Sequence, residues 1–222
     1  MKNCQFTNCP RNQEKLPLLF DRKDDTISKI RFIVLSQDPG ASLRTHPTKC
    51  TNPEIMEDYL IKECREKKGV VPARIGRIFA KGFDPSVDEV YWTHSLKCVP
   101  ISDRDITKQW KTCAPLCKDY FMREIQLISS EGLVLIPLGR YALALCRHLL
   151  EGRPLSNVGG IVKYMQGHVS PSWQKPSSFP EKRMLVLPFI HPRHREQVLK
   201  LHEGLADIEK SFAETIRTRC AA

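Results

Sequence analysis

Apolar and polar positions along this chain form blocks that predict a repeated order of strand and helix. Four short apolar runs, each stopped by glycine, proline or polar residues, are typical of buried strands: Ile30–Leu35, Val90–Leu96, Leu133–Leu138 and Met184–Ile190. Apolar residues at helical spacing predict helices over 54–68, 106–130 and 139–150. A further short strand is expected over Ile161–Met165, and one long amphipathic helix from Val198 to Ile216.

This alternation determines the expected fold class. Strands that alternate with helices pair in parallel, and the helices cover the faces of the sheet. We therefore predict an α/β fold, a three-layer α/β/α sandwich around a central, mostly parallel four-stranded sheet. Because no repeat or composition break divides the sequence, residues 1–222 are expected to form a single domain. Ligands of such sheets bind at the carboxyl ends of the strands, here Gln37–Gly40, His94–Cys98, Gly139–Arg140 and His191–Arg193.

Composition and charge narrow the class of protein. Hydrophobic residues make up 41% of the chain and charged residues 27%, which excludes a disordered chain, a collagen-like chain or a disulfide mini-scaffold. The longest apolar run is too short to cross a bilayer and Met1–Arg11 lacks a signal-peptide pattern, so we expect an intracellular protein without a membrane partner. The net charge of +10 favours a nucleic acid as partner, although it also suits a merely basic, solvated surface.

The cysteines suggest a metal. The chain has nine, an odd number, and disulfides are disfavoured inside a cell. Five of them fall in two short stretches: Cys4, Cys9, Cys98, Cys113 and Cys117. Four thiolates can hold either a [4Fe–4S] cluster or a zinc ion. The alternative is a set of buried thiols with no ligand, since unpaired cysteine is often buried.

The order of these motifs resembles the uracil-DNA glycosylase superfamily, and most closely its iron–sulfur members. Those proteins have a cysteine pair near the start, a strand ending Gly-Glu-Ala-Pro-Gly, then Tyr-Ile-Thr-Asn-Val-Val-Lys-Cys, a helix that begins at the fourth cysteine, Leu-Gly-Arg, and His-Pro. The matching stretches here are Cys4/Cys9, Ser36–Gly40, Tyr91–Cys98, Cys117–Ile128, Leu138–Arg140 and His191–Pro192. The Gln-Asp-Pro of the first motif is similar instead to the best-known uracil-DNA glycosylases, in which that Asp positions the attacking water.

The resemblance implies a ligand set and a cofactor. Cys4, Cys9, Cys98 and Cys117 would hold a structural [4Fe–4S] cluster, with zinc as the alternative occupant. Cys113 competes with Cys117 for the fourth place. Cys117 is preferred because Tyr120 and Ile125 follow it at the offsets that the helix of the family shows. The cluster would tie the N-terminal segment to the segment after the second strand.

The resemblance also implies a catalytic pair. The Asp38 carboxylate would stabilise positive charge on the sugar and orient water, and the His191 imidazole would stabilise negative charge on the leaving base. From the residues alone, Asp38-Pro39-Gly40 is also an ordinary turn, and a histidine after a strand is often a polar cap.

Four further residues are expected to bind the substrate: Gln37, Gly40, His94 and Arg193. His94 falls where the family has the Asn that recognises uracil, so it would contact uracil or another deaminated base, unless it packs inside. Arg193 is expected either to contact a phosphate or to belong to a solvated run of charge, and Lys97 to be a phosphate or surface charge.

Together these features predict a monofunctional DNA glycosylase, a monomer that hydrolyses the N-glycosidic bond of uracil or a related deaminated base in DNA. The alternative is a non-catalytic nucleic-acid-binding protein on the same fold. A glycosylase requires Asp38 and His191 to face one pocket, whereas a binding protein without catalysis does not.

Overall fold

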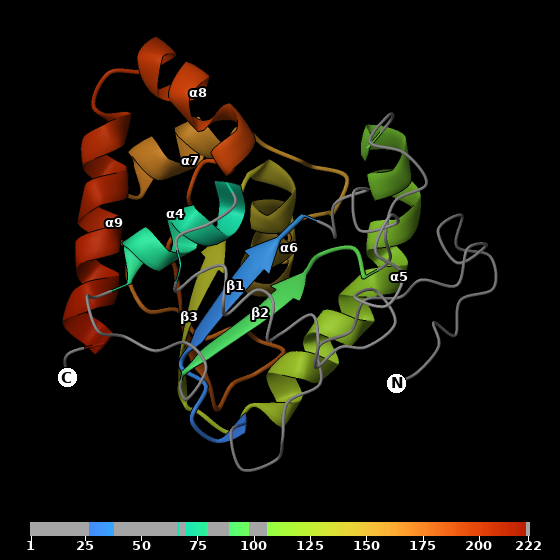
Figure 1. Cartoon of the computed structure of the whole chain (residues 1–222). Helices are drawn as coiled ribbons and strands as arrows, with labels where there is room; N and C mark the ends of the chain where they lie inside the picture. Colours follow the sequence, from blue (N-terminus) through green and yellow to red (C-terminus); the bar gives the residue numbers. More distant parts are fainter. Residues whose placement is uncertain (1–26, 38–65, 67–69, 80–88, 98–105, 221–222) are drawn as a thin grey trace.

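The computed structural model describes residues 27–37, 66, 70–79, 89–97 and 106–220 and has a parallel sheet at its centre (Figure 1). The sheet contains the four strands β1 (Phe32–Ser36), β2 (Val90–His94), β3 (Gly132–Pro137) and β4 (Arg183–Val186). Their order is β2-β1-β3-β4, and every neighbouring pair is parallel. The predicted α/β class and the parallel four-stranded sheet are therefore confirmed.

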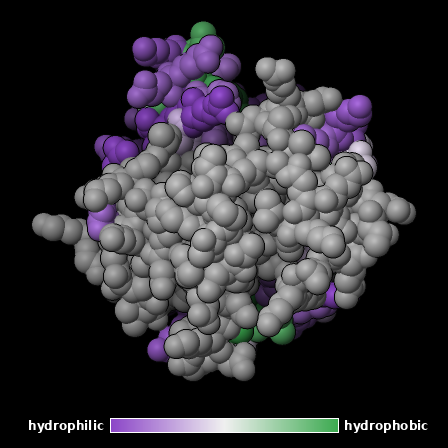
Figure 2. Space-filling view, turned by 45° about the vertical axis from the view of Figure 1, so that its right-hand side comes forward, coloured by the Kyte–Doolittle hydropathy of each residue, from purple (hydrophilic) through white to green (hydrophobic). Residues whose placement is uncertain are grey.

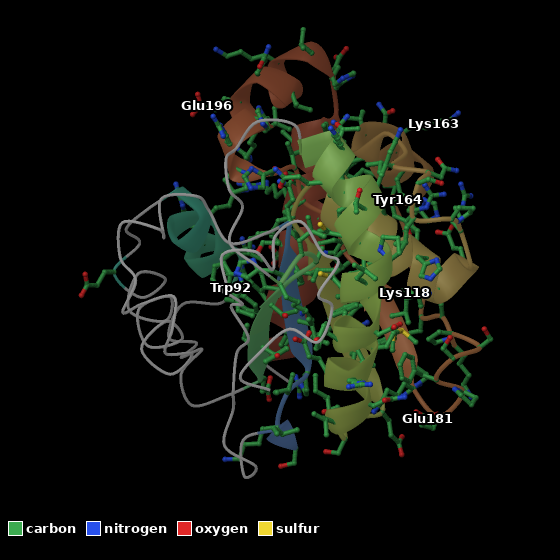
Figure 3. All side chains as sticks on the ribbon, turned by 90° about the vertical axis from the view of Figure 1, so that its right-hand side faces the viewer. Trp92, Lys118, Lys163, Tyr164, Glu181 and Glu196 are labelled. Atoms are coloured by element: carbon green, nitrogen blue, oxygen red, sulfur yellow. The ribbon has the colours of Figure 1, made fainter. Side chains whose placement is uncertain are left out.

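Each face of the sheet is covered by its own pair of helices. Side chains of a strand point alternately to the two faces, and in β1 Ile33 packs with α5 (Ile106–Leu127) and α6 (Arg140–Glu151). Phe32 packs instead with α4 (Val70–Ile78) and α9 (Leu205–Cys220), so the two faces bury separate cores. Figure 3 shows Trp92 of β2 pointing to the α4 face.

The path of the chain identifies the edge where a ligand site is expected. After β1 the chain reaches β2 on one side, and it then passes through α5 to β3 on the other side of β1. The helices after β1 and after β3 thus cover opposite faces of the sheet. Such a reversal leaves a crevice at the carboxyl ends of the two strands, and this is where open α/β sheets bind ligands. Gln37 and Gly139 follow β1 and β3 at this point.

The short strand expected over Ile161–Met165 is wrong. These residues begin helix α7 (Ile161–Gly167). A run of five residues fits either period, and here the buried side chains Tyr164 and Met165 lie one helical turn from Ile161, where they join the two cores. Contacts with α9 decide between the two periods.

The single C-terminal helix is also wrong. The segment forms the short helix α8 (Arg195–Leu201) and then α9. Gly204 has a φ of +75°, a left-handed conformation that breaks the helix and that glycine adopts without strain. As a result Leu201 leaves the apolar stripe and is 70% exposed.

One expected helix is not tested by the structure, and one observed helix was not expected. The helix expected over 54–68 lies outside the described residues, apart from residue 66, and is not tested. Helix α4 begins at Val70, directly after Gly69, where the sequence predicts only the end of the helix over 54–68. Within the part of the chain that the structure describes, no helix has the length and apolar character needed to span a membrane.

Candidate functional site at the carboxyl edge of the sheet

The structure brings the described site residues to one edge of the sheet. Ser36 and His94 end β1 and β2 in direct register, and Gln37 follows Ser36. Beyond the strands, the backbone N–H of Leu96 donates to the carbonyl of Gln37 at 2.9 Å, and that of Gly139 donates to Phe189 at 2.9 Å. The first bond joins the end of β2 to that of β1, and the second joins the end of β3 to the segment that leads to His191, so that segment also ends at this edge. Asp38 and Gly40 lie outside the described residues.

His94 is buried, with 7% of its surface exposed. Its Nδ1 atom is hydrogen-bonded to the hydroxyl of Ser36, which fixes the orientation of the ring. His94 lies two residues after Trp92 and therefore points to the same α4 face. The expectation that His94 sits at the carboxyl edge is confirmed, whereas its contact with a base remains a prediction.

His191 lies at the start of the one-turn helix η3 (Pro192–His194) and is partly buried. Its Nδ1 atom accepts a hydrogen bond from the backbone N–H of Arg193 at 3.3 Å. Burial lowers the pKa of His191 to about 4, and the nearby positive charges of His194 and Arg193 act in the same direction. The ring is therefore neutral at pH 7, and because Nδ1 is an acceptor, the proton resides on Nε2.

Gly139 allows this placement of His191. Its φ of +86° and ψ of 175° belong to a region that is essentially restricted to glycine. A side-chain Cβ at this position would also stand 3.0 Å from the Cβ of His191. The end of β3 and the histidine are thus in contact because residue 139 has no side chain. The Leu-Gly-Arg motif was noticed in the sequence, but this role of its glycine was not.

Basic side chains flank the same edge. Arg140, the first residue of α6, is exposed, and its guanidinium lies 4.9 Å from the ring centre of Tyr141. Arg193 is exposed on η3, as a contact to phosphate requires. Hydrophilic side chains gather at the top of the molecule in Figure 2, where Figure 1 places α8.

Lys97 was expected to contact a phosphate or to be a charge on the surface, and this is wrong. Its side chain is only 3% exposed, and its ammonium group donates to both carboxylate oxygens of Glu124 in α5, at 2.6 and 2.7 Å. It also donates to the hydroxyl of Thr93 at 2.6 Å. A buried ammonium is stable only when it is paired in this way. Lys97 therefore fixes the end of β2 to α5.

Of the four predicted cluster ligands, the structure describes Cys117, which is buried on α5 together with its competitor Cys113. Cys4, Cys9 and Cys98 lie outside the described residues. Among the residues that are described, no three His, Cys, Asp or Glu side chains are grouped so as to hold a metal ion. Lys97, which immediately precedes Cys98, reaches Glu124, two turns of α5 beyond Cys117.

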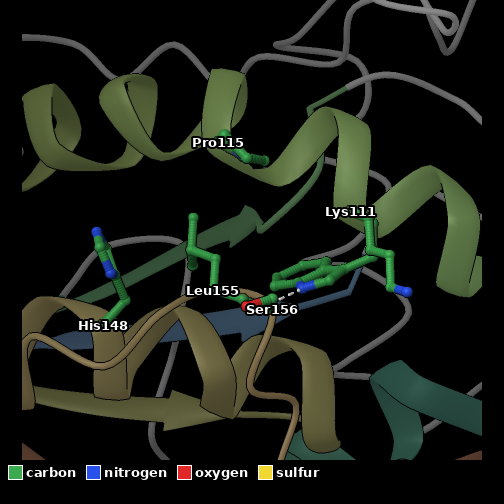
Figure 4. Close-up of a pocket in the computed structure, with 6 residues that line it drawn as sticks. Lys111, Pro115, His148, Leu155 and Ser156 are labelled. Carbon is green, nitrogen blue, oxygen red and sulfur yellow. Dashed lines mark hydrogen bonds between the residues drawn. The ribbon is translucent and has the colours of Figure 1, made fainter.

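A separate cavity of about 280 Å³ lies between α5, α6 and the segment after α6 (Figure 4). The indole N–H of Trp110 donates to the carbonyl of Leu155 at its base, at 2.8 Å. The cavity belongs to the α5 side of the sheet, opposite to His94, and none of the predicted site residues lines it. Its lining consists of Trp110, Lys111, Pro115, His148, Leu155 and Ser156.

Two functional candidates were missed in the sequence. Ser36 was quoted only as part of a motif, yet it holds His94. Glu209 of α9 binds the segment that carries His191, and a single carboxylate in an amphipathic helix gives no sign of this. No protein-family model and no curated protein matches this chain, so its function has to be inferred from its own residues and geometry.

Proposed function

We propose that this protein is a monofunctional DNA glycosylase that hydrolyses the N-glycosidic bond of uracil or a related deaminated base. The observation that carries the proposal is the state of His191, a neutral imidazole at the carboxyl edge of the sheet with its proton on Nε2. A neutral N–H donor can stabilise an anionic leaving group without a net charge in the ground state. The same Nδ1 contact makes His191 the polar cap of η3, and the proposal adds a role for the Nε2–H, which the cap does not use.

The reaction separates two charges. As the bond between C1′ and the base nitrogen breaks, its electron pair moves to the base, whose carbonyl oxygen becomes negative. The Nε2–H of His191 would donate to that oxygen. The Asp38 carboxylate would stabilise the positive sugar and take a proton from the water that attacks C1′. The base leaves as an anion and is neutralised by the proton that Asp38 took from the water, so the products are the free base and an abasic sugar, and no lysine is required.

Binding would begin with the DNA backbone. The net charge of +10 and the exposed Arg140 and Arg193 near the edge suit contacts to phosphates. A flipped base would then enter the crevice between Gln37, His94 and His191. Cys4, Cys9, Cys98 and Cys117 would hold a structural [4Fe–4S] cluster, which orders the chain and supplies no chemistry to the reaction.

The second candidate is a nucleic-acid-binding protein on the same fold without catalysis. One observation favours it: His94 is buried and hydrogen-bonded to Ser36, as a packed core histidine would be. This candidate accounts for the basic surface and for His191 as the cap of η3, but it gives the Nε2–H of His191 no role.

A panel of oligonucleotides tests the proposal. Each oligonucleotide carries one deaminated base, in single or double strands, and is scored for abasic sites under single-turnover conditions. Asp38→Asn keeps the turn-forming ability but removes the charge, and His191→Asn removes the imidazole donor. Each is expected to lower the rate by about a hundredfold or more with little loss of DNA affinity.

His202→Asn, at an exposed position after α8, is the matched control and should leave the rate unchanged. If the unaltered protein releases no base from any oligonucleotide but still binds DNA in a salt-dependent manner, the second candidate replaces the first.

A further inference from the structure

Glu209 is a buried acid that the proposed chemistry does not use. It is 3% exposed, and its two oxygens accept hydrogen bonds from three separate segments. Oε1 accepts from the backbone N–H of Ile190 at 3.1 Å. Oε2 accepts from the Nε of Arg195 at 2.8 Å and from the guanidinium of Arg74. A buried carboxylate is costly unless it is paired, and here both oxygens are paired.

The three donors lie around the histidine segment. Ile190 is the residue before His191, and Arg195 is the first residue of α8, just after η3. Arg74 belongs to α4, which packs against η3. Glu209 therefore binds the chain immediately before and immediately after the turn that carries His191, and it joins that turn to α9 and α4.

Helix η3 contributes little packing of its own, whereas Phe189 and Ile190 just before it are buried in the core. Helix η3 is three residues long and contains no buried residue. Its contact with β3 passes through Gly139, which offers no side chain to pack against. The hydrogen bonds to Glu209 add polar contacts that link the residues on either side of η3 to α9, and through Arg74 to α4.

We propose that Glu209 is a positioning residue, which holds the His191 imidazole at the carboxyl edge of the sheet in the orientation that its N–H donation requires. This inference rests on the proposed function of His191. Misplacing a catalytic group by about 1 Å can cost on the order of a hundredfold in rate. Loss of Glu209 should therefore lower kcat far more than it changes the affinity for DNA.

The ionisation of His191 provides a test that does not depend on activity. The charged or titratable groups around it are Arg193 and His194 of its own turn, Arg74 of α4, Arg140 of α6, Arg195 of α8 and Glu209 of α9. Removal of the negative charge of Glu209 would by electrostatics lower the pKa of His191 further. Release of the turn into water would instead raise that pKa from about 4 towards 6.5, because burial is the largest cause of the lowered value. The two effects thus have opposite signs.

The experiment is an NMR titration of the histidines in the full-length protein, with hydrogen exchange at the Ile190 amide. For Glu209→Gln we expect the pKa of His191 to rise and the Ile190 amide to exchange at least tenfold faster. Glu214→Gln, on the same helix but 67% exposed and paired with Arg217, is the matched control and should change neither.

If Glu209→Gln does not fold, Glu209→Asp decides the question. It keeps the charge for Arg74 and Arg195 but withdraws the oxygen from Ile190, so both readouts should move in the same direction by a smaller amount. The inference is overturned if a folded variant leaves the pKa of His191 and the exchange of Ile190 unchanged. If both move but the parent protein releases no base, Glu209 still anchors the turn and it is the proposed function that fails.

Discussion

Ser36 of β1 and His94 of β2 stand directly opposite each other in the sheet, and the Ser36 hydroxyl is hydrogen-bonded to Nδ1 of His94. The sequence comparison with uracil-DNA glycosylases, which is an expectation, would align these two positions with Gly and Asn. The two side chains are in contact and act as one unit. A histidine held in this way presents a fixed edge, whereas an unanchored ring could rotate.

This pairing predicts a coupled effect on base preference. His94→Asn is expected to shift activity towards uracil, because an amide offers both a donor and an acceptor to the uracil edge. Ser36→Ala should change the ratio of rates on uracil and hypoxanthine by several-fold, since the ring loses its anchor. Single-turnover rates on the two substrates measure both effects. Ser211→Ala, exposed on α9, is the control, and equal ratios for Ser36→Ala and the parent would exclude the coupling.

The low pKa of His191 predicts the acid limit of activity. The ring stays neutral until the pH falls to about 4, so the rate should show no inflection near the usual histidine value of 6.5. A pH–rate profile of the chemical step checks this expectation. An acid limb with a midpoint near 6.5 that disappears in His191→Asn would show that His191 titrates normally and would contradict the assigned state.

The same shift predicts how stability depends on pH. Between pH 6.5 and about 4 the unfolded chain binds a proton on this histidine and the folded chain does not. The contribution of His191 to stability is therefore fully present above pH 6.5 and is lost as the pH falls towards 4. Urea unfolding at pH 7 and at pH 4.5 should show a smaller loss for His191→Asn than for the parent protein.

Gly139→Ala is expected to disturb the site from the opposite strand. The positive φ would cost about 1–3 kcal/mol of stability, and the new Cβ, 3.0 Å from the Cβ of His191, would push the histidine away from the edge. The temperature of thermal unfolding should fall, and so should the rate of the proposed base release. Gly167→Ala is the control, because a Cβ there meets nothing within 4 Å. An unchanged rate for Gly139→Ala would argue against the placement of His191.

The cysteines predict a metal content. Protein purified without oxygen should be brown, with about four irons and four sulfides per chain. Cys117→Ala should bleach the colour more than Cys113→Ala, and Cys146→Ala, buried in α6 outside the predicted set, should not bleach it. Iron analysis and the visible spectrum decide the matter, and stoichiometric zinc without iron would favour the zinc alternative.

The sequence by itself determined the layers of the fold and the edge that matters. Buried strands such as Leu133–Leu138 are marked by local runs of apolar residues, and their alternation with helices implies a parallel sheet. His94, Gln37 and His191 could be placed at one edge because the ends of parallel strands always meet there. That reasoning needs only the order of elements along the chain.

The tertiary structure alone decided which charges are structural. Lys97 and Arg193 look alike in the sequence, yet Lys97 is buried against Glu124 and Arg193 is exposed. Glu209 binds residues that are distant from it in sequence, including Arg74 of another helix. Helix α7 likewise packs against α9, a contact that the apolar run of α7 does not indicate. The free energy of a charged or half-buried group depends on what surrounds it in space, and no local pattern records those neighbours.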